Sequence, residues 1–105
     1  MKGMALTKRD VVSTIRRNRA RLQTLGVHRL GLFGSFARSE QKSASDIDLL
    51  VEFQAGKKTF DNFMELSFFL ESVLQRRVEL VTVESLSPYL APHILKEVEY
   101  VSLAA

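Results

Sequence analysis

Cysteine is absent from this sequence, which excludes a disulfide framework and a thiolate metal site. Proline and glycine are scarce, and a composition of 46% hydrophobic and 26% charged residues is typical of a globular α/β or α+β protein. No apolar run approaches the roughly 18 residues that a membrane helix needs, and the N-terminus lacks the apolar segment of a signal peptide. We therefore expect one domain over residues 1–105, no membrane contact and a reducing, cytoplasmic location.

Acidic residues are rare in the first part of the chain. Residues 1–45 carry ten Lys and Arg against two acids, a balance of +8, whereas residues 46–105 carry five against ten, a balance of −5, and the two sum to the net charge of +3. Such a division can mark a nucleic-acid surface or a cationic wall facing a polyanionic ligand. The alternative is a solvated, arginine-rich helix face.

Apolar periodicity predicts a small mixed β-sheet with helices packed against it, an α+β fold. The first helix is expected to begin at Thr7, whose capping box includes Asp10, and to end before Gly26. The expected elements are a helix over 7–25, a strand over 28–33, a short helix over 35–39, a polar loop over 40–45, a strand over 47–53, a turn over 55–58, a helix from 59 or 61 to about 75, a strand over 76–83, a helical turn opened by Pro88 and capped by Ser87, a helix over 92–98, and a short strand or frayed tail over 99–105.

A glycine and a serine, Gly34 and Ser35, directly follow the first expected strand. Glycine lets backbone approach a ligand closely, and backbone N–H groups with a serine hydroxyl can hold phosphate oxygens. The same pair is also compatible with a plain strand-to-helix turn in which Ser35 caps the helix.

Two carboxylates, Asp46 and Asp48, stand one residue apart where the second expected strand begins. Side chains at i and i+2 of a strand point to the same face, so the two would repel each other unless a cation lies between them. Mg²⁺ prefers such hard oxygen ligands and leaves positions open for substrate phosphates. The alternative is an Asp46 that caps a turn and an exposed Asp48.

An acid also interrupts the third expected strand, because Glu79 lies between Val78 and Leu80. An unpaired buried carboxylate is costly, so Glu79 should be exposed, bound to metal, or paired with Arg76 or Arg77. A third carboxylate on a neighbouring strand is what a two-metal nucleotidyl-transfer site requires.

Together, the stretch GLFGSFARSEQKSASDIDLLVEF places G-S ten residues before D-x-D, with a further acid in a later strand. This pattern resembles the DNA-polymerase-β-like nucleotidyltransferase superfamily, and most of all its minimal nucleotidyltransferase (MNT) branch, over nearly the whole chain. The resemblance implies the nucleotidyltransferase fold. It also implies that Gly34 and Ser35 hold the β- and γ-phosphates of a nucleotide and that Arg38 faces the triphosphate.

By the same resemblance, Asp46 and Asp48 would be catalytic ligands of one or two Mg²⁺ ions, and Glu79 would be the third metal-binding and catalytic carboxylate. Two departures from the family pattern stand out. The third acid is usually Asp, so Glu79 is one methylene longer, and the glycine that commonly follows the arginine is here Ser39, which is expected to tighten or reshape the phosphate loop.

The activity implied by the resemblance is Mg²⁺-dependent nucleotidyl transfer from ATP. Relatives are often encoded beside a HEPN-domain toxin and act as its antitoxin, some by transferring AMP to a toxin tyrosine. We therefore expect a protein adenylyltransferase with a HEPN toxin as partner.

The alternative is a non-catalytic antitoxin that neutralises the toxin by forming a complex. Transfer to a small molecule such as an aminoglycoside is less favoured, because relatives with that activity carry an additional helical domain. Direct nucleic-acid binding through the arginine-rich half is possible but not favoured, and oligomerisation stays open.

Overall fold

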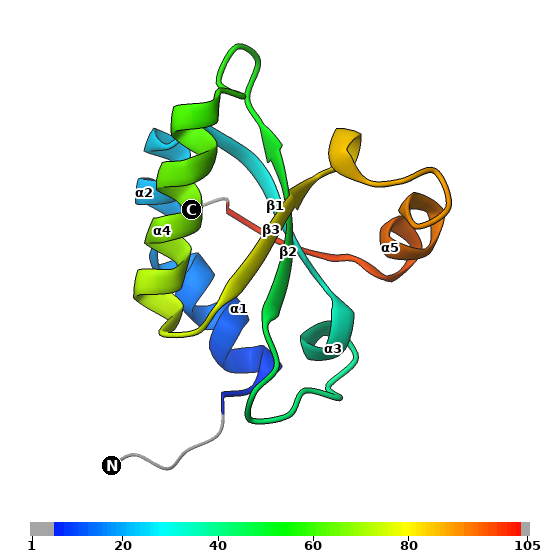
Figure 1. Ribbon diagram of the computed structural model, residues 1–105. Helices are drawn as coiled ribbons and strands as arrows, with labels where there is room; N and C mark the ends of the chain where they lie inside the picture. Colours follow the sequence, from blue (N-terminus) through cyan, green and yellow to red (C-terminus); the bar gives the residue numbers. More distant parts are fainter. Residues whose placement is uncertain (1–5, 104–105) are drawn as a thin grey trace.

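A four-stranded β-sheet with helices on both faces organises the protein (Figure 1). The computed structural model describes residues 6–103, and this range includes all the elements named below. In chain order these are α1 (Lys8–Arg17), α2 (Arg19–Thr24), β1 (Val27–Phe33), α3 (Gly34–Ala37), β2 (Ile47–Phe53), α4 (Phe60–Leu74), β3 (Val78–Thr82), the 3₁₀ helix η1 (Val83–Ser85), α5 (Ala91–Glu97) and β4 (Glu99–Val101).

The sheet is mixed, with the strand order β3-β2-β1-β4. Strand β1 pairs antiparallel with β2 and with β4, whereas β3 pairs parallel with β2. The register places Asp48 of β2 between Phe33 of β1 and Glu79 of β3. The expected α+β fold with a mixed sheet is confirmed.

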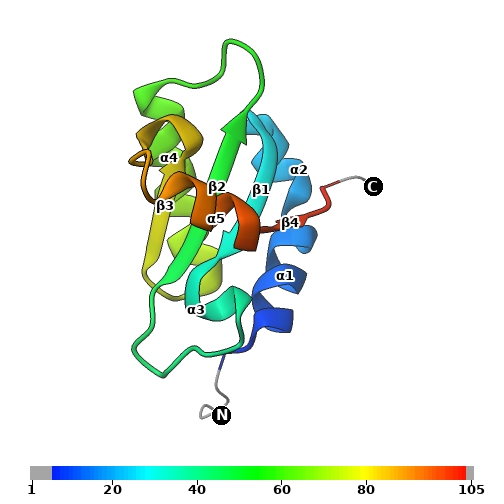
Figure 2. The ribbon, with the colours of Figure 1, turned by 90° about the vertical axis from the view of Figure 1, so that its right-hand side faces the viewer.

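The two faces of the sheet carry different side chains. Helices α1, α2 and α4 cover one face, and the alternate β2 residues Ile47, Leu49 and Val51 are buried in the core on that side. The intervening residues of β2, Asp48 and Leu50, point to the opposite face because side chains alternate along a strand. Helices α3 and α5 lie on this second face, where α5 crosses in front of β2 and β1 (Figure 2).

The prediction of one continuous helix over 7–25 is wrong, since the structure has α1 and α2 with a break at Asn18. The Asn18 side-chain amide donates to the Thr14 carbonyl at 2.8 Å, and its backbone φ is −107°. An asparagine that bonds the backbone in this way competes with regular helix. The expected capping box is confirmed, because Thr7 accepts from the Asp10 N–H and Asp10 accepts from the Thr7 N–H.

The other predicted elements agree closely with the structure. The strand expected over 47–53 matches β2, and Gly26, with φ +89°, follows the end of α2 as predicted. The expected turn after Ser87 is present over residues 88–90, with the Ser87 hydroxyl accepting from the Leu90 N–H at 3.2 Å, and regular helix starts at Ala91 rather than at the expected Pro92. The C-terminal strand alternative is confirmed by β4, while residues 104–105 of that prediction lie outside the described residues. No helix within residues 6–103 is long and apolar enough to cross a membrane.

Candidate active site

The backbone of Gly34 lies directly against the side chain of Asp48. Gly34 opens α3 with φ +75°, and a Cβ added there would overlap the Asp48 carboxylate. Antiparallel pairing of β1 and β2 creates this proximity, since Phe33 is the register partner of Asp48. The structure therefore brings the glycine of the G-S pair next to the second aspartate of D-x-D.

Asp48 is only partly exposed, and several acids surround it. Burial first, and then the negative charges of Glu79, Asp46 and Glu97, raise the pKa of Asp48 from 3.8 to about 6, against a smaller opposing effect of Arg38. Burial is the main cause of this raised pKa, and the neighbouring acids add a repulsion that a divalent cation would relieve.

Two further acids are neighbours of Asp48. Asp46 precedes it by two residues in the chain, and Glu79 lies beside it on the adjacent strand β3. Glu79 is the parallel register partner of Asp48 and is exposed, which is one of the three states expected for it. Asp46 comes within 4.0 Å of the Arg77 Nε, a pair that is largely open to solvent. No ion pair involves Glu79 among residues 6–103, so the alternative pairing with Arg76 or Arg77 is not observed there.

The chemistry of these carboxylates fits Mg²⁺, although the described residues contain no cluster of three or more acidic or histidine side chains close enough to hold an ion. Mg²⁺ is commonly bound through one or two carboxylates, with substrate phosphates and waters completing its coordination. Asp46 and Asp48 are sufficient for that mode of binding. The expected role of Glu79 as a third ligand stays a prediction.

The loop after Gly34 carries the other candidate nucleotide-binding residues. Ser35 is partly buried in α3, and Arg38 follows α3 with its side chain about half exposed. Ser39 adopts the left-handed conformation, with φ +57°, which glycine adopts without strain. The loop thus has the backbone geometry of a glycine at this position even though the residue is serine.

The sequence analysis missed one residue of this region, Glu97 at the end of α5. Its Oε2 accepts a hydrogen bond from the Gly34 N–H at 2.7 Å, and its Oε1 accepts one from Arg38 Nη1 at 2.8 Å. Burial tends to raise the pKa of Glu97, but the bonds from Gly34 and Arg38 outweigh it and leave that pKa below its ordinary value. The sequence offers no signal that separates Glu97 from its exposed neighbour Glu99.

The arginine-rich segment lies on the other side of the sheet from these residues. Arg16, Arg17 and Arg21 are exposed on α1 and α2, which cover the face opposite α3 and α5 (Figure 1). These arginines therefore do not form a cationic wall facing the candidate site.

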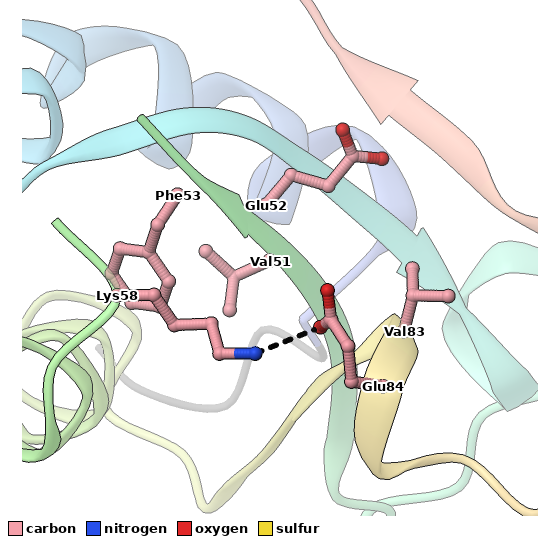
Figure 3. A pocket seen from close by; sticks show the side chains of 6 residues that line it. All are labelled: Val51, Glu52, Phe53, Lys58, Val83 and Glu84. Atoms are coloured by element: carbon pink, nitrogen blue, oxygen red, sulfur yellow. Dashed lines mark ion pairs between the residues drawn. The ribbon is translucent and has the colours of Figure 1, made fainter. Parts of the chain in front are cut away.

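A hollow of about 250 Å³ is present near the other end of β2, away from Asp48. In it Lys58 and Glu84 point toward each other and form an ion pair of 3.3 Å (Figure 3). Its lining contains none of the predicted site residues; it consists of Val51, Glu52, Phe53, Lys58, Val83 and Glu84.

Comparisons with known proteins agree with this arrangement. Residues 12–101 match the family model described as "Nucleotidyltransferase domain", a range that includes every candidate residue named above. Protein adenylyltransferase MntA of Thermococcus cleftensis is 38% identical over 97 residues, which are 91% of this chain and 97% of the relative.

Two solved structures have the same fold. One, named as a "putative minimal nucleotidyltransferase", superposes with a TM-score of 0.71 at 33% identity and covers 92% of this chain and 98% of its own. The other is a toxin–antitoxin with AMP-PNP, with a TM-score of 0.65 at 25% identity, covering 94% of this chain and 75% of its own. The predicted family is thereby confirmed: this chain belongs to the nucleotidyltransferase domain family.

Proposed function

We propose that this protein is a Mg²⁺-dependent protein adenylyltransferase that transfers AMP from ATP to a tyrosine hydroxyl of a HEPN-type toxin and so acts as its antitoxin. The observation that carries the proposal is the contact between Gly34 and Asp48, which brings the backbone that would bind phosphate next to a carboxylate that would bind the metal. The name of the Thermococcus cleftensis relative supports adenylyl transfer to a protein. The similar toxin–antitoxin structure with AMP-PNP supports the partner and the nucleotide.

In the proposed reaction, the tyrosine oxygen attacks the α-phosphorus of ATP. A new phosphorus–oxygen bond forms to the tyrosine, the bond between the α-phosphorus and the bridging oxygen breaks, and pyrophosphate leaves. Asp46 and Asp48 would hold Mg²⁺, which would neutralise the charge that develops on the phosphates. Gly34, Ser35 and Arg38 would orient the β- and γ-phosphates through the backbone N–H, the hydroxyl and the guanidinium.

Glu79 would take the proton that the tyrosine loses. It is exposed and lies directly across from Asp48 in the parallel register, so an incoming hydroxyl can reach it. A general base of this kind contributes typically about 10²- to 10⁴-fold to the rate. The extra methylene of Glu relative to the usual Asp extends its reach from the strand.

Growth of cells that express a HEPN-type partner tests the antitoxin role. Co-expression of the wild-type chain should restore growth and add the mass of one or more AMP groups to the partner. The Asp46→Ala/Asp48→Ala variant should do neither. Rescue by that variant, with the partner unmodified but bound, would contradict the catalytic proposal and favour neutralisation by complex formation.

A further inference from the structure

Two of the groups proposed to bind the nucleotide phosphates, the Gly34 N–H and the Arg38 guanidinium, already donate to an acceptor within the protein. Glu97 accepts from the Gly34 N–H and from Arg38, at 2.7 and 2.8 Å, with one carboxylate oxygen for each donor. The side chain of Glu97 is only 27% exposed, so both hydrogen bonds are partly shielded from water. The donors and the acceptor are far apart in the sequence, separated by 63 and 59 residues.

A phosphate oxygen and a carboxylate oxygen compete for such donors. The Gly34 N–H has a single hydrogen, so it cannot donate fully to Glu97 and to a nucleotide at once. Phosphate would also be repelled by the negative charge of Glu97 if that carboxylate stayed in place. Binding of a triphosphate through the Gly34 N–H therefore requires the Glu97 carboxylate to move away, whereas Arg38 has further N–H donors.

The exposure of helix α5 is compatible with such a movement. None of its residues is buried, and Leu95 is 42% exposed. The close contact at its end is made by the next residue, Val98, which packs against Gly31 so tightly that a Cβ at position 31 would overlap it. With few buried apolar contacts, a short helix of this kind opens at low free-energy cost.

We propose that Glu97 is a displaceable substitute for the nucleotide phosphates: its carboxylate holds Gly34 and Arg38 in the free protein, and the triphosphate replaces it and releases α5. The inference rests on the proposed function, because it requires Gly34 and Arg38 to bind phosphate. It adds two consequences. The Glu97 carboxylate competes with the nucleotide and so lowers its affinity, and bound nucleotide frees α5 from its bonds to Gly34 and Arg38.

The first test measures nucleotide affinity by calorimetry with AMP-PNP and Mg²⁺, and separately with inorganic tripolyphosphate. Glu97→Ala should raise the affinity for both ligands about tenfold, because the acceptor that competes for the Gly34 N–H is gone. Glu40, which accepts from Arg38 Nε at 2.9 Å, stays in place in this variant. Glu97→Gln, which keeps a neutral acceptor for Gly34, should give a smaller gain. The control is Glu99→Gln. Glu99 is two residues from Glu97 and forms an exposed ion pair with Lys8, so the loss of its charge should leave both affinities unchanged.

The second test measures amide hydrogen exchange of residues 91–98. In the wild type, saturating AMP-PNP and Mg²⁺ should speed exchange of this segment at least several-fold, because α5 loses its anchor. In Glu97→Ala the segment should exchange fast already and not respond to nucleotide. A residue that merely anchors α5 would not produce this nucleotide-dependent change in the wild type.

The outcomes separate the two proposals. Wild-type binding of AMP-PNP with equal or weaker binding by Glu97→Ala, and no faster exchange of residues 91–98, would overturn the role of Glu97 while the proposed function stands. Absence of nucleotide binding in both the wild type and Glu97→Ala would overturn the proposed function and this inference with it.

Discussion

Gly34 and Asp48 are in such close contact that no side chain fits between them. Gly34 has φ +75°, and a Cβ there would overlap the Asp48 carboxylate. Two requirements thus meet at one position, a left-handed backbone and an absent side chain. Gly34 is needed for the geometry of the site as well as for the turn.

Replacement of Gly34 by alanine should destabilise the protein by about 3 kcal/mol or more, from left-handed strain and overlap together. Gly56→Ala is the matched control, because Gly56 has a similar φ of +78° but open space around it. That control should cost only about 1 to 2 kcal/mol. Urea denaturation of both variants measures the difference, and equal losses would show that the contact with Asp48 is unimportant.

Replacement of Ser39 by glycine should stabilise the protein by about 1 kcal/mol, because serine has a left-handed backbone there, with φ +57°. Gln75→Gly at the end of α4, where φ is +55°, provides a reference for the same effect far from the site. Thermal unfolding of the two variants checks the prediction. A loss of stability in Ser39→Gly alone would mean that the serine side chain supports the loop.

The contribution of Asp48 to the free energy of unfolding should decrease as the pH rises from about 4 to 6. The pKa of Asp48 is about 6 in the folded protein and 3.8 ordinarily, so in this window the folded state binds more protons than the unfolded state. An excess of bound protons in the folded state makes stability decrease with increasing pH, until Asp48 is ionised in both states.

The variant Asp48→Asn cannot ionise and should therefore be more stable than the wild type at pH 7, by about 1 to 2 kcal/mol after allowance for the solvent that reaches the group. At pH 4 the two proteins should be nearly equal. Urea denaturation at pH 4, 5, 6 and 7 gives the comparison, with Glu65→Gln on the exposed face of α4 as a control. Wild-type and Asp48→Asn curves that run parallel would contradict the raised pKa.

Replacement of Glu79 by glutamine should reduce adenylyl transfer about 100-fold and leave stability within about 0.5 kcal/mol, since the side chain is exposed. Glu79→Asp should keep or raise activity, because a carboxylate remains. Glu84→Gln, which loses only an exposed ion pair with Lys58, serves as the control. Unchanged transfer by Glu79→Gln would remove Glu79 from the mechanism, and loss of folding would show a packing role instead.

The strongest local patterns in the sequence predicted the structure well. Alternation over residues 47–53 predicted β2 to the residue, and the Thr7 capping box predicted where α1 begins. The resemblance implied that G-S and D-x-D belong to one site, but the direct contact between Gly34 and Asp48 was not among the expectations. The break at Asn18 was not expected either, since it depends on whether one side-chain amide bonds the Thr14 carbonyl or faces water.

The role of Glu97 could not be predicted for a different reason. Its bond to Gly34 joins positions 63 residues apart, and no periodic pattern in α5 indicates which acid turns toward the sheet. Contacts of this kind are decided by the packing of the whole chain.

The most direct test of the account uses purified protein, Mg²⁺, a purified HEPN-type partner and ATP labelled at either the α- or the γ-phosphate, with Asp46→Ala/Asp48→Ala as the control. The account predicts that label from the α position alone becomes attached to a tyrosine of the partner, and only with the wild-type protein. Transfer of γ-label, equal transfer by the double variant, or no transfer while the partner is bound and neutralised would contradict it.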